Sequence, residues 1–265
     1  MNNQAQSSDA FAFVAAAERY YASLASYAQT RAGAPGSGDV SLGGKLLYAG
    51  ELGEEARALV VAGNVAGAAT LCATANPMAQ RQANHDGIVD FVVTNLDEAL
   101  RILKNEIRKK EPVAVCVGVE PGELEKEMLE RGVQPDLVKA GVAAMNALAV
   151  TPTLQAEDEA LLAWQVAETP ARWMPRLDAL AMESLSKEDA CGRRWLRLMP
   201  RYCGRIARGM RVVRCRPEEA RGFVASAELA ALRGEIGVLV DVEMTHRGRT
   251  DRRRFAPEAP MTNKS

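Results

Sequence analysis

Residues 94–117 read TNLDEALRILKNEIRKKEPVAVCV and contain a helix followed directly by a strand. Asn95 can cap the helix, with Glu98 three residues further on as in a capping box. Apolar residues recur at helical spacing, at Leu96, Leu100, Leu103 and Ile107. Pro112 ends the helix, and the continuous apolar run Val113–Val117 predicts a strand that is buried on both faces.

The same alternation of an apolar run and an amphipathic segment extends over residues 44–150. The other apolar runs are Lys45–Ala49, Ala68–Ala73, Val89–Val93 and Asp136–Val138. Strands that alternate with helices are typical of a parallel sheet covered on both faces. We therefore predict an α/β fold, a doubly wound, Rossmann-like parallel sheet, for residues 44–150.

Two different regions flank this layer. Residues 1–43 are predicted to form an N-terminal helical arm that starts at Asp9, followed by a Gly/Pro/Ser-rich linker over residues 31–38. Residues 151–265 are predicted to form a helical, mixed α/β region. Its expected elements are helices at 157–167, 171–185 and 217–232, strands at 210–215 and 236–246, and a charged, mobile tail from Arg247.

Composition excludes several classes of protein. The 265 residues carry 33 Lys+Arg and 34 Asp+Glu, so the formal charge of −1 does not favour a protein that coats nucleic acid. No apolar run approaches the ~20 residues needed to span a bilayer, and the polar N-terminus resembles no signal peptide. Two histidines and five cysteines without a CxxC pair predict neither a metal site nor a disulfide framework. A reducing, cytoplasmic location and no membrane association are expected.

The ends of the predicted strands supply the candidate cofactor-binding residues. In an open parallel sheet ligands bind at the carboxyl ends of the strands, which here carry Gly50, Gly53, Asn76, Thr94 and Gly118. A glycine turn before a helix can hold a pyrophosphate, but this turn has Gly-x-x-Gly and lacks the full Gly-x-Gly-x-x-Gly pattern. Two other interpretations compete: Asn76 can be a helix cap, and Glu51, Glu54 and Glu55 suit a helix N-terminus without any ligand.

An arginine-rich segment follows in the C-terminal region. Nine arginines lie between residues 193 and 216, and no acidic residue interrupts them. Four-residue spacing from Arg193 to Arg205 would place four of them on one helix face, with Pro200 kinking that helix. One interpretation is an anion site at Arg201, Arg205 and Arg208. The other is a salt network, within the chain or between subunits, with Glu54 and Glu55 or with the glutamates of residues 123–130.

Five segments in the first half of the chain show a resemblance to a known family. They are Leu46–Gly53, Val65–Cys72, Asp86–Asp90, Leu96–Leu100 and Met128–Val138. Together, in this order, they resemble the central NAD-binding domain of urocanase (urocanate hydratase). The resemblance implies a Rossmann-like fold, NAD as cofactor, and chemistry in which NAD+ takes up the imidazole of the substrate so that water can add to the ring.

The sequence departs from the family at the positions that this chemistry needs. Glutamates replace most of the glycine-dense first turn, and Asn76 stands where the family has acidic residues. Residues 139–142 read Lys-Ala-Gly-Val where the family has a Thr/Asp/Gln-Ser-His stretch, and the family's catalytic Tyr, Asp and Cys have no counterpart that we can place. No catalytic residue is therefore assigned.

These departures lead to three functional hypotheses. The first is a urocanase-like protein without full hydratase activity that acts as a ligand-binding or assembly module, with a small molecule or a second copy as partner. The second is a divergent NAD-dependent lyase or hydratase on an imidazole-type or small anionic substrate, with arginines of residues 201–216 holding the anion. The third is a structural partner subunit. A homo-oligomer is expected, and nucleic acid is disfavoured because little aromatic character accompanies the arginines.

Overall fold

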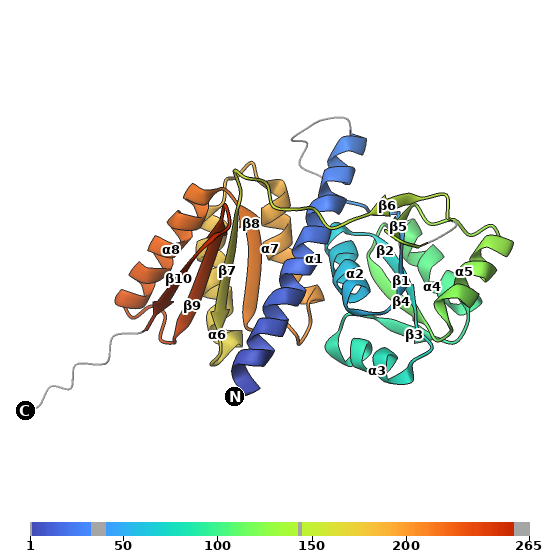
Figure 1. The fold of residues 1–265 in the computed structure, drawn as a ribbon, viewed down its shortest axis with the longest axis horizontal. Coiled ribbons are helices and arrows are strands. Elements are labelled where there is room, and N and C mark those ends of the chain that lie inside the picture. The colour runs from blue at the N-terminus through green and yellow to red at the C-terminus, as the bar shows by residue number, and fades with distance from the viewer. Residues whose placement is uncertain (1, 33–40, 143–144, 257–265) are drawn as a thin grey trace, which may run out of the picture. The chain divides into compact units, whose positions relative to one another are not determined.

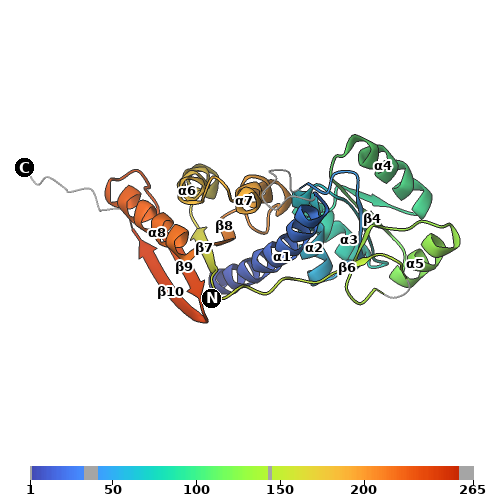
Figure 2. The same cartoon turned by 90° about the horizontal axis from the view of Figure 1, so that it is seen from above.

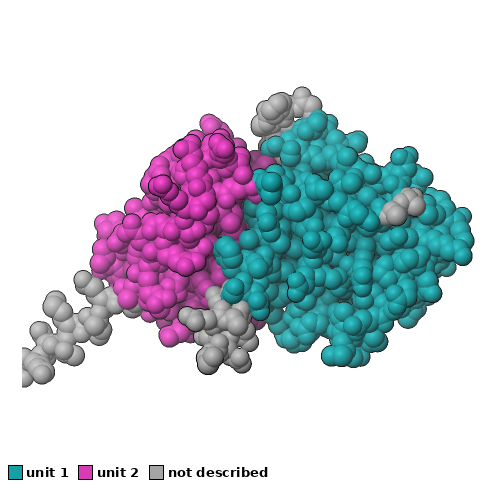
Figure 3. Space-filling model, in the orientation of Figure 1, with its two compact units in different colours: residues 1–154, 197–207 teal, residues 155–196, 208–265 magenta. Residues whose placement is uncertain are grey.

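The computed structural model describes residues 2–32, 41–142 and 145–256, which form two compact units (Figures 1 and 3). Unit 1 contains residues 1–154 and 197–207, and unit 2 contains residues 155–196 and 208–265. The predicted linker lies mostly at residues 33–40, outside the described residues.

Unit 1 is built on a six-stranded sheet in the order β3-β4-β2-β1-β5-β6, and every strand pairing in it is parallel. The strands are β1 (Leu46–Glu51), β2 (Ala69–Ala73), β3 (Phe91–Val93), β4 (Val113–Val117), β5 (Leu137–Lys139) and β6 (Leu148–Val150). The chain places β2 and β4 on one side of β1, and β5 and β6 on the other. This confirms the predicted Rossmann-like sheet and puts the reversal of strand order between β1 and β5.

Helices cover both faces of this sheet. α1 (Asn2–Ala32) and α2 (Glu54–Ala66) lie on one face, and α4 (Leu96–Lys109) and α5 (Pro121–Glu130) on the other (Figures 1 and 2). α3 (Pro77–Asp86) connects β2 to β3. α1 begins before the expected start at Asp9, and it packs along α2 with Val14, Tyr21 and Leu24 buried. α1 is therefore packed into unit 1, whereas the sequence suggested an appended arm.

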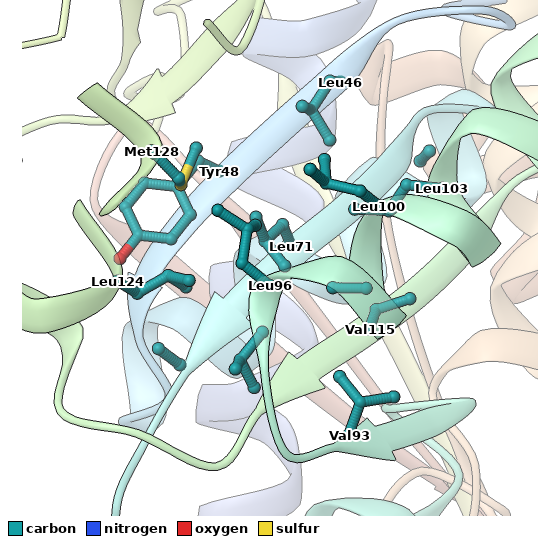
Figure 4. Close-up of a cluster of buried hydrophobic side chains, with 14 of the residues drawn as sticks. Leu46, Tyr48, Leu71, Val93, Leu96, Leu100, Leu103, Val115, Leu124 and Met128 are labelled. Carbon is teal, nitrogen blue, oxygen red and sulfur yellow. The ribbon is translucent and has the colours of Figure 1, made fainter. Parts of the chain in front are cut away.

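The apolar stripe of α4 packs on the sheet as its spacing predicted. Leu96, Leu100 and Leu103 of α4 meet Tyr48, Leu71 and Val115 of the sheet in one buried cluster, to which α5 adds Leu124 and Met128 (Figure 4). The predicted cap also forms: the Asn95 side chain accepts from the Glu98 N–H at 2.9 Å, and the Glu98 carboxylate accepts from the Thr94 N–H at 3.1 Å.

Unit 2 is a four-stranded antiparallel sheet in the order β10-β9-β7-β8. The strands are β7 (Ala160–Val166), β8 (Met210–Cys215), β9 (Val240–His246) and β10 (Arg249–Phe255). The helices after β7 are α6 (Pro170–Ser184), α7 (Ala190–Tyr202) and α8 (Pro217–Leu232). Of these, β8, α6 and α8 match the predicted elements closely.

Two predictions in this region are wrong. The helix expected at 157–167 is the strand β7, because a short apolar run has no period that separates a buried strand from a helix. Trp164 of β7 faces Phe223 of α8 with ring centroids 4.7 Å apart. The tail expected from Arg247 instead forms β10, which pairs with β9 along its whole length. Residues 257–265 lie outside the described part of the chain.

Gly63 lies where α2 approaches the sheet closely. A Cβ at this position would lie 2.8 Å from both Leu47 Cδ2 and Thr70 Oγ1, and those two side chains are fully buried. Only glycine fits here without displacing them.

We expect Gly63→Ala to destabilise the protein by about 1–3 kcal/mol, because overpacking outweighs the gain in helix propensity. Gly122→Ala in α5 is the matched control, since a Cβ there meets nothing within 4 Å. The control should be neutral or stabilising by up to about 1 kcal/mol. Urea unfolding of both variants checks this, and equal stability of the two would contradict the close packing of α2.

Candidate functional site

The strand-end edge of unit 1 is the candidate site, and its first turn follows β1. Gly50 has a positive φ of 72°, and a Cβ on it would lie 3.1 Å from Cγ2 of Val142. Val142 follows β5, which is the neighbour of β1 across the reversal of strand order. A valine side chain from the segment after β5 therefore lies directly beside the first glycine of the turn.

The second glycine, Gly53, has open space beside it, but glutamates precede and follow it in the chain. It is the N-cap of α2, and a Cβ on it would meet nothing within 4 Å. Its N–H donates to the Glu51 carbonyl at 2.8 Å. Glu51, Glu54 and Glu55 are all exposed around this helix start, and Glu55 forms an ion pair of 3.1 Å with Lys139.

Asn76 acts as the helix cap that the sequence allowed. Its side-chain oxygen accepts from the N–H groups of Met78 and Ala79 at 2.9 and 3.3 Å, at the start of α3. A carboxylate that could hold ribose hydroxyls is absent from this position. The oxygen of Asn76 is committed to α3.

Gly118 and Thr94 lie at the ends of the neighbouring strands β4 and β3. The Gly118 N–H donates to Val93 O at 2.8 Å, and a Cβ on Gly118 would lie 3.3 Å from Nε2 of Gln80. Gln80 is held there because its amide donates to Thr74 O at 2.7 Å. The Thr94 hydroxyl donates to the Glu98 carboxylate at 3.3 Å. The polar groups of both positions are therefore used inside the fold.

These contacts test whether a dinucleotide fits the edge. A pyrophosphate needs free amides and positive potential at the first turn, and the turn offers a committed Gly53 N–H and three exposed carboxylates. Val142 takes the space beside Gly50. The residues present do not fit NAD in the manner of this fold class. The predictions that these five residues bind a cofactor stay predictions.

Sequence reasoning missed Val142, Gln80 and Tyr48. Val142 and Gln80 gave no signal, because their roles come from contacts between segments distant in the chain. Tyr48 donates from its hydroxyl to Oε1 of Glu125 at 3.2 Å. Burial, and then the charge of Glu125, raise the pKa of Tyr48 far above its ordinary value. Tyr48 is thus a protonated donor inside the core.

The arginine-rich segment divides into two groups. In unit 2, Arg211 pairs with Asp178 at 3.1 Å, Arg214 with Glu159 at 3.2 Å and Arg216 with Glu219 at 2.7 Å. Arg193 donates to Met182 O and Leu185 O at the end of α6. This confirms a salt network within the chain. Its carboxylates are not the expected ones, because Glu55 pairs with Lys139, and Glu127 and Glu130 pair with Arg131 and Lys126.

The proposed anion-binding residues are exposed, and they do not lie on one helix face. α7 continues through Pro200 but ends at Tyr202, so Arg205 and Arg208 follow the helix. Arg201 and Arg205 belong to unit 1, and Arg208 to unit 2. The Arg201 guanidinium lies 5.3 Å from the centre of the Tyr202 ring.

A tight contact fixes the turn after α7 on α3. The Arg205 N–H donates to Asp86 O at 3.1 Å, and a Cβ on Gly204 would lie 1.6 Å from that same oxygen. The Arg205 side chain contacts the ring of His85. The Asp86 carboxylate in turn accepts from Arg57 and from Gln82. His85 lies in the last turn of α3.

Four of the five cysteines are buried, and the fifth, Cys191, is partly buried. All five cysteines are free, and Cys203 and Cys215 are buried rather than exposed among the arginines. Burial, and then Asp189, raise the pKa of Cys191 to about 11. In the described part of the chain, no three or more His, Cys, Asp or Glu side chains are arranged so that they could hold a metal ion. None of the helices over the described ranges has the length and apolar character to cross a bilayer.

Comparison with protein families agrees with this architecture. The family model described as the urocanase Rossmann-like domain matches residues 21–170, which is more than half of the chain. The chain belongs to the urocanase family. The match runs from the middle of α1 through the complete parallel sheet to the start of α6, so the family relationship includes all the strand ends described above.

Glu219 holds the start of α8 and provides a test of the salt network. Its carboxylate accepts from the N–H groups of Ser186 and Arg216 at 2.8 and 2.9 Å. Burial alone would raise the pKa of Glu219, but the hydrogen bonds from Arg216 and from these N–H groups outweigh it, so that pKa is lowered.

We expect Glu219→Gln to lower the stability of the protein by about 1–3 kcal/mol at neutral pH. Since the folded pKa is lowered, this contribution is present above the ordinary glutamate pKa of about 4.3 and is lost as pH falls through the folded value. Thermal unfolding across pH should show the difference from wild type shrinking in acid. The exposed Glu228→Gln on the same helix is the control, and a constant difference at all pH values would refute the assignment.

Proposed function

We propose that this urocanase-family protein does not hydrate urocanate with NAD and instead acts as a ligand-binding or assembly module. The observation that carries the proposal is the contact of Val142 with Gly50 beside the three exposed glutamates of the same turn. Space and charge both oppose a pyrophosphate at this place.

Charge opposes a pyrophosphate at this turn independently of the space beside Gly50. A pyrophosphate carries negative charge, and two like charges 4 Å apart repel by about 1 kcal/mol in water and by about 4 kcal/mol near a protein surface. Three carboxylates surround the start of α2, and only Glu55 has a cation partner among the described residues. The favourable helix dipole is already used by Glu54 and Glu55.

Residues 139–142, at the carboxyl end of β5, also supply no acid for the proton chemistry of a hydratase. Addition of water to an activated ring needs an acid near the substrate. The segment after β5 contributes Lys139, which pairs with Glu55, and the apolar Val142. Tyr48 is inside the core, where its hydroxyl donates to Glu125.

One observation favours the alternative of a divergent NAD-dependent lyase or hydratase. The space beside Gly53 is open, and no side chain caps α2. If a dinucleotide enters there, its charge has to be balanced by cations from outside the turn.

The third hypothesis is a structural partner subunit. Like our proposal, it expects no cofactor at the strand-end edge. A cytoplasmic location and a homo-oligomer remain part of the proposal.

Wild-type protein should show no thermal shift with millimolar NAD+ and no loss of the ultraviolet absorbance of urocanate. The triple variant Glu51→Gln, Glu54→Gln, Val142→Ala should bind NAD+ better than wild type, because it loses two charges and the side chain over Gly50. The control is Glu127→Gln with Glu130→Gln, which removes the same amount of charge near the C-terminal end of α5. It should leave the affinity for NAD+ unchanged.

A saturable shift in wild-type protein that Gly50→Val abolishes would contradict the proposal and favour the enzyme. Turnover of urocanate by the wild-type protein, and its loss in Gly50→Val, would identify a hydratase directly.

A further inference from the structure

A row of exposed arginines, with one histidine among them, crosses two segments of unit 1 that are far apart in sequence. It consists of Arg81 and His85 on α3, Arg197 and Arg201 on α7, and Arg205 in the following turn; we call these five residues the basic strip. The contact of Arg205 with His85 joins its two halves. The strip exists because Gly204 allows the turn to dock on Asp86 O.

The arginines of the strip lack the partners that the neighbouring arginines have. Within the described ranges, no carboxylate pairs with Arg81, Arg197, Arg201 or Arg205, whereas Arg211, Arg214 and Arg216 all find one. Arg197 and Arg201 are one helical turn apart, where like charges repel. An anionic partner from outside the chain would relieve this repulsion.

The same unit presents surfaces of opposite charge. Glu51 and Glu54 at the start of α2, and Glu120 and Glu123 at the start of α5, are exposed; we call these four residues the acidic rim. Over the described residues, no cation pairs with any of them and no ion pair links the rim to the strip. The formal charge of −1 shows that acidic and basic residues nearly balance over the whole chain.

We infer that the basic strip binds the acidic rim of a second copy of this chain. A head-to-tail contact of this kind uses one surface from each copy and forms closed rings or filaments, while a two-fold arrangement uses the contact twice. In both cases the association depends on charge and weakens with salt, since the Debye length falls from about 10 Å at 0.1 M to about 3 Å at 1 M.

A nucleic acid is the competing occupant, and the strip is poorly built for one. Tyr202 is the only aromatic residue between Arg197 and Arg205, and the Arg201 guanidinium already lies over its ring. Recognition of single strands relies on aromatic rings that stack bases. The inference rests on the assembly role proposed above and names its partner.

Two double variants reverse the surfaces separately. Arg197→Glu with Arg201→Glu makes the strip acidic, and Glu51→Lys with Glu54→Lys makes the rim basic. Arg101→Glu with Lys104→Glu, on the exposed side of α4, is the control for charge reversal in this unit. Sedimentation velocity at low and high salt reports the association, and circular dichroism confirms that each variant is folded.

Wild type and the α4 control should associate at low salt and dissociate at 1 M salt. Each reversed variant should stay monomeric alone, and an equimolar mixture of the two should associate again, because each then offers the charge that the other lacks. If Glu54→Lys unfolds the protein, Glu120→Lys with Glu123→Lys replaces it as the rim variant.

A monomeric wild type at low salt, or a mixture that fails to associate, overturns the inference. Binding of a single-stranded oligonucleotide to a monomeric wild type, lost on reversing the strip, assigns the strip to nucleic acid instead. Binding of NAD+ by a protein that still self-associates would refute only the proposed loss of the cofactor.

Discussion

Parallel pairing of all six strands in unit 1 is the constraint on which the other features of this protein depend. It brings every carboxyl end to one edge, so that Gly50 and Val142, 92 positions apart in the chain, meet there. In this fold class the reversal of strand order is the place where ligands bind. Here that place, between β1 and β5, receives Val142 and the ion pair of Lys139 with Glu55. The family relationship is therefore retained in the framework, while the contacts at the strand ends are different from what a dinucleotide needs.

The parallel sheet could be predicted from the sequence because local signals agreed with the fold. The run Val113–Val117 and the helix that begins after Asn95 appear at the predicted residues, since capping, periodicity and Pro112 all act within a few positions. The strand β7 could not be predicted, because Ala160–Val166 is too short to show a period and its burial depends on α8. The pairing of β10 with β9 is set by a hairpin whose arginines resemble a solvated tail.

The candidate site was predictable only in its position. The sequence places Gly50, Asn76 and Gly118 at strand ends, and the structure confirms this placement. What surrounds them was hidden, because Val142 over Gly50 and Gln80 beside Gly118 are contacts between elements. The arginine segment shows the same limit. Its charge was evident, but the carboxylates that neutralise part of it lie on α6, directly before β7 and on α8, and could not be identified from spacing.

The central claim is that the strand-end edge holds no dinucleotide, and native mass spectrometry of protein purified under mild conditions tests it most directly. Our account requires that neither the single chain nor its multiples carry the mass of a dinucleotide. A species heavier by the mass of one NAD per chain, which disappears when the protein is denatured, would contradict it.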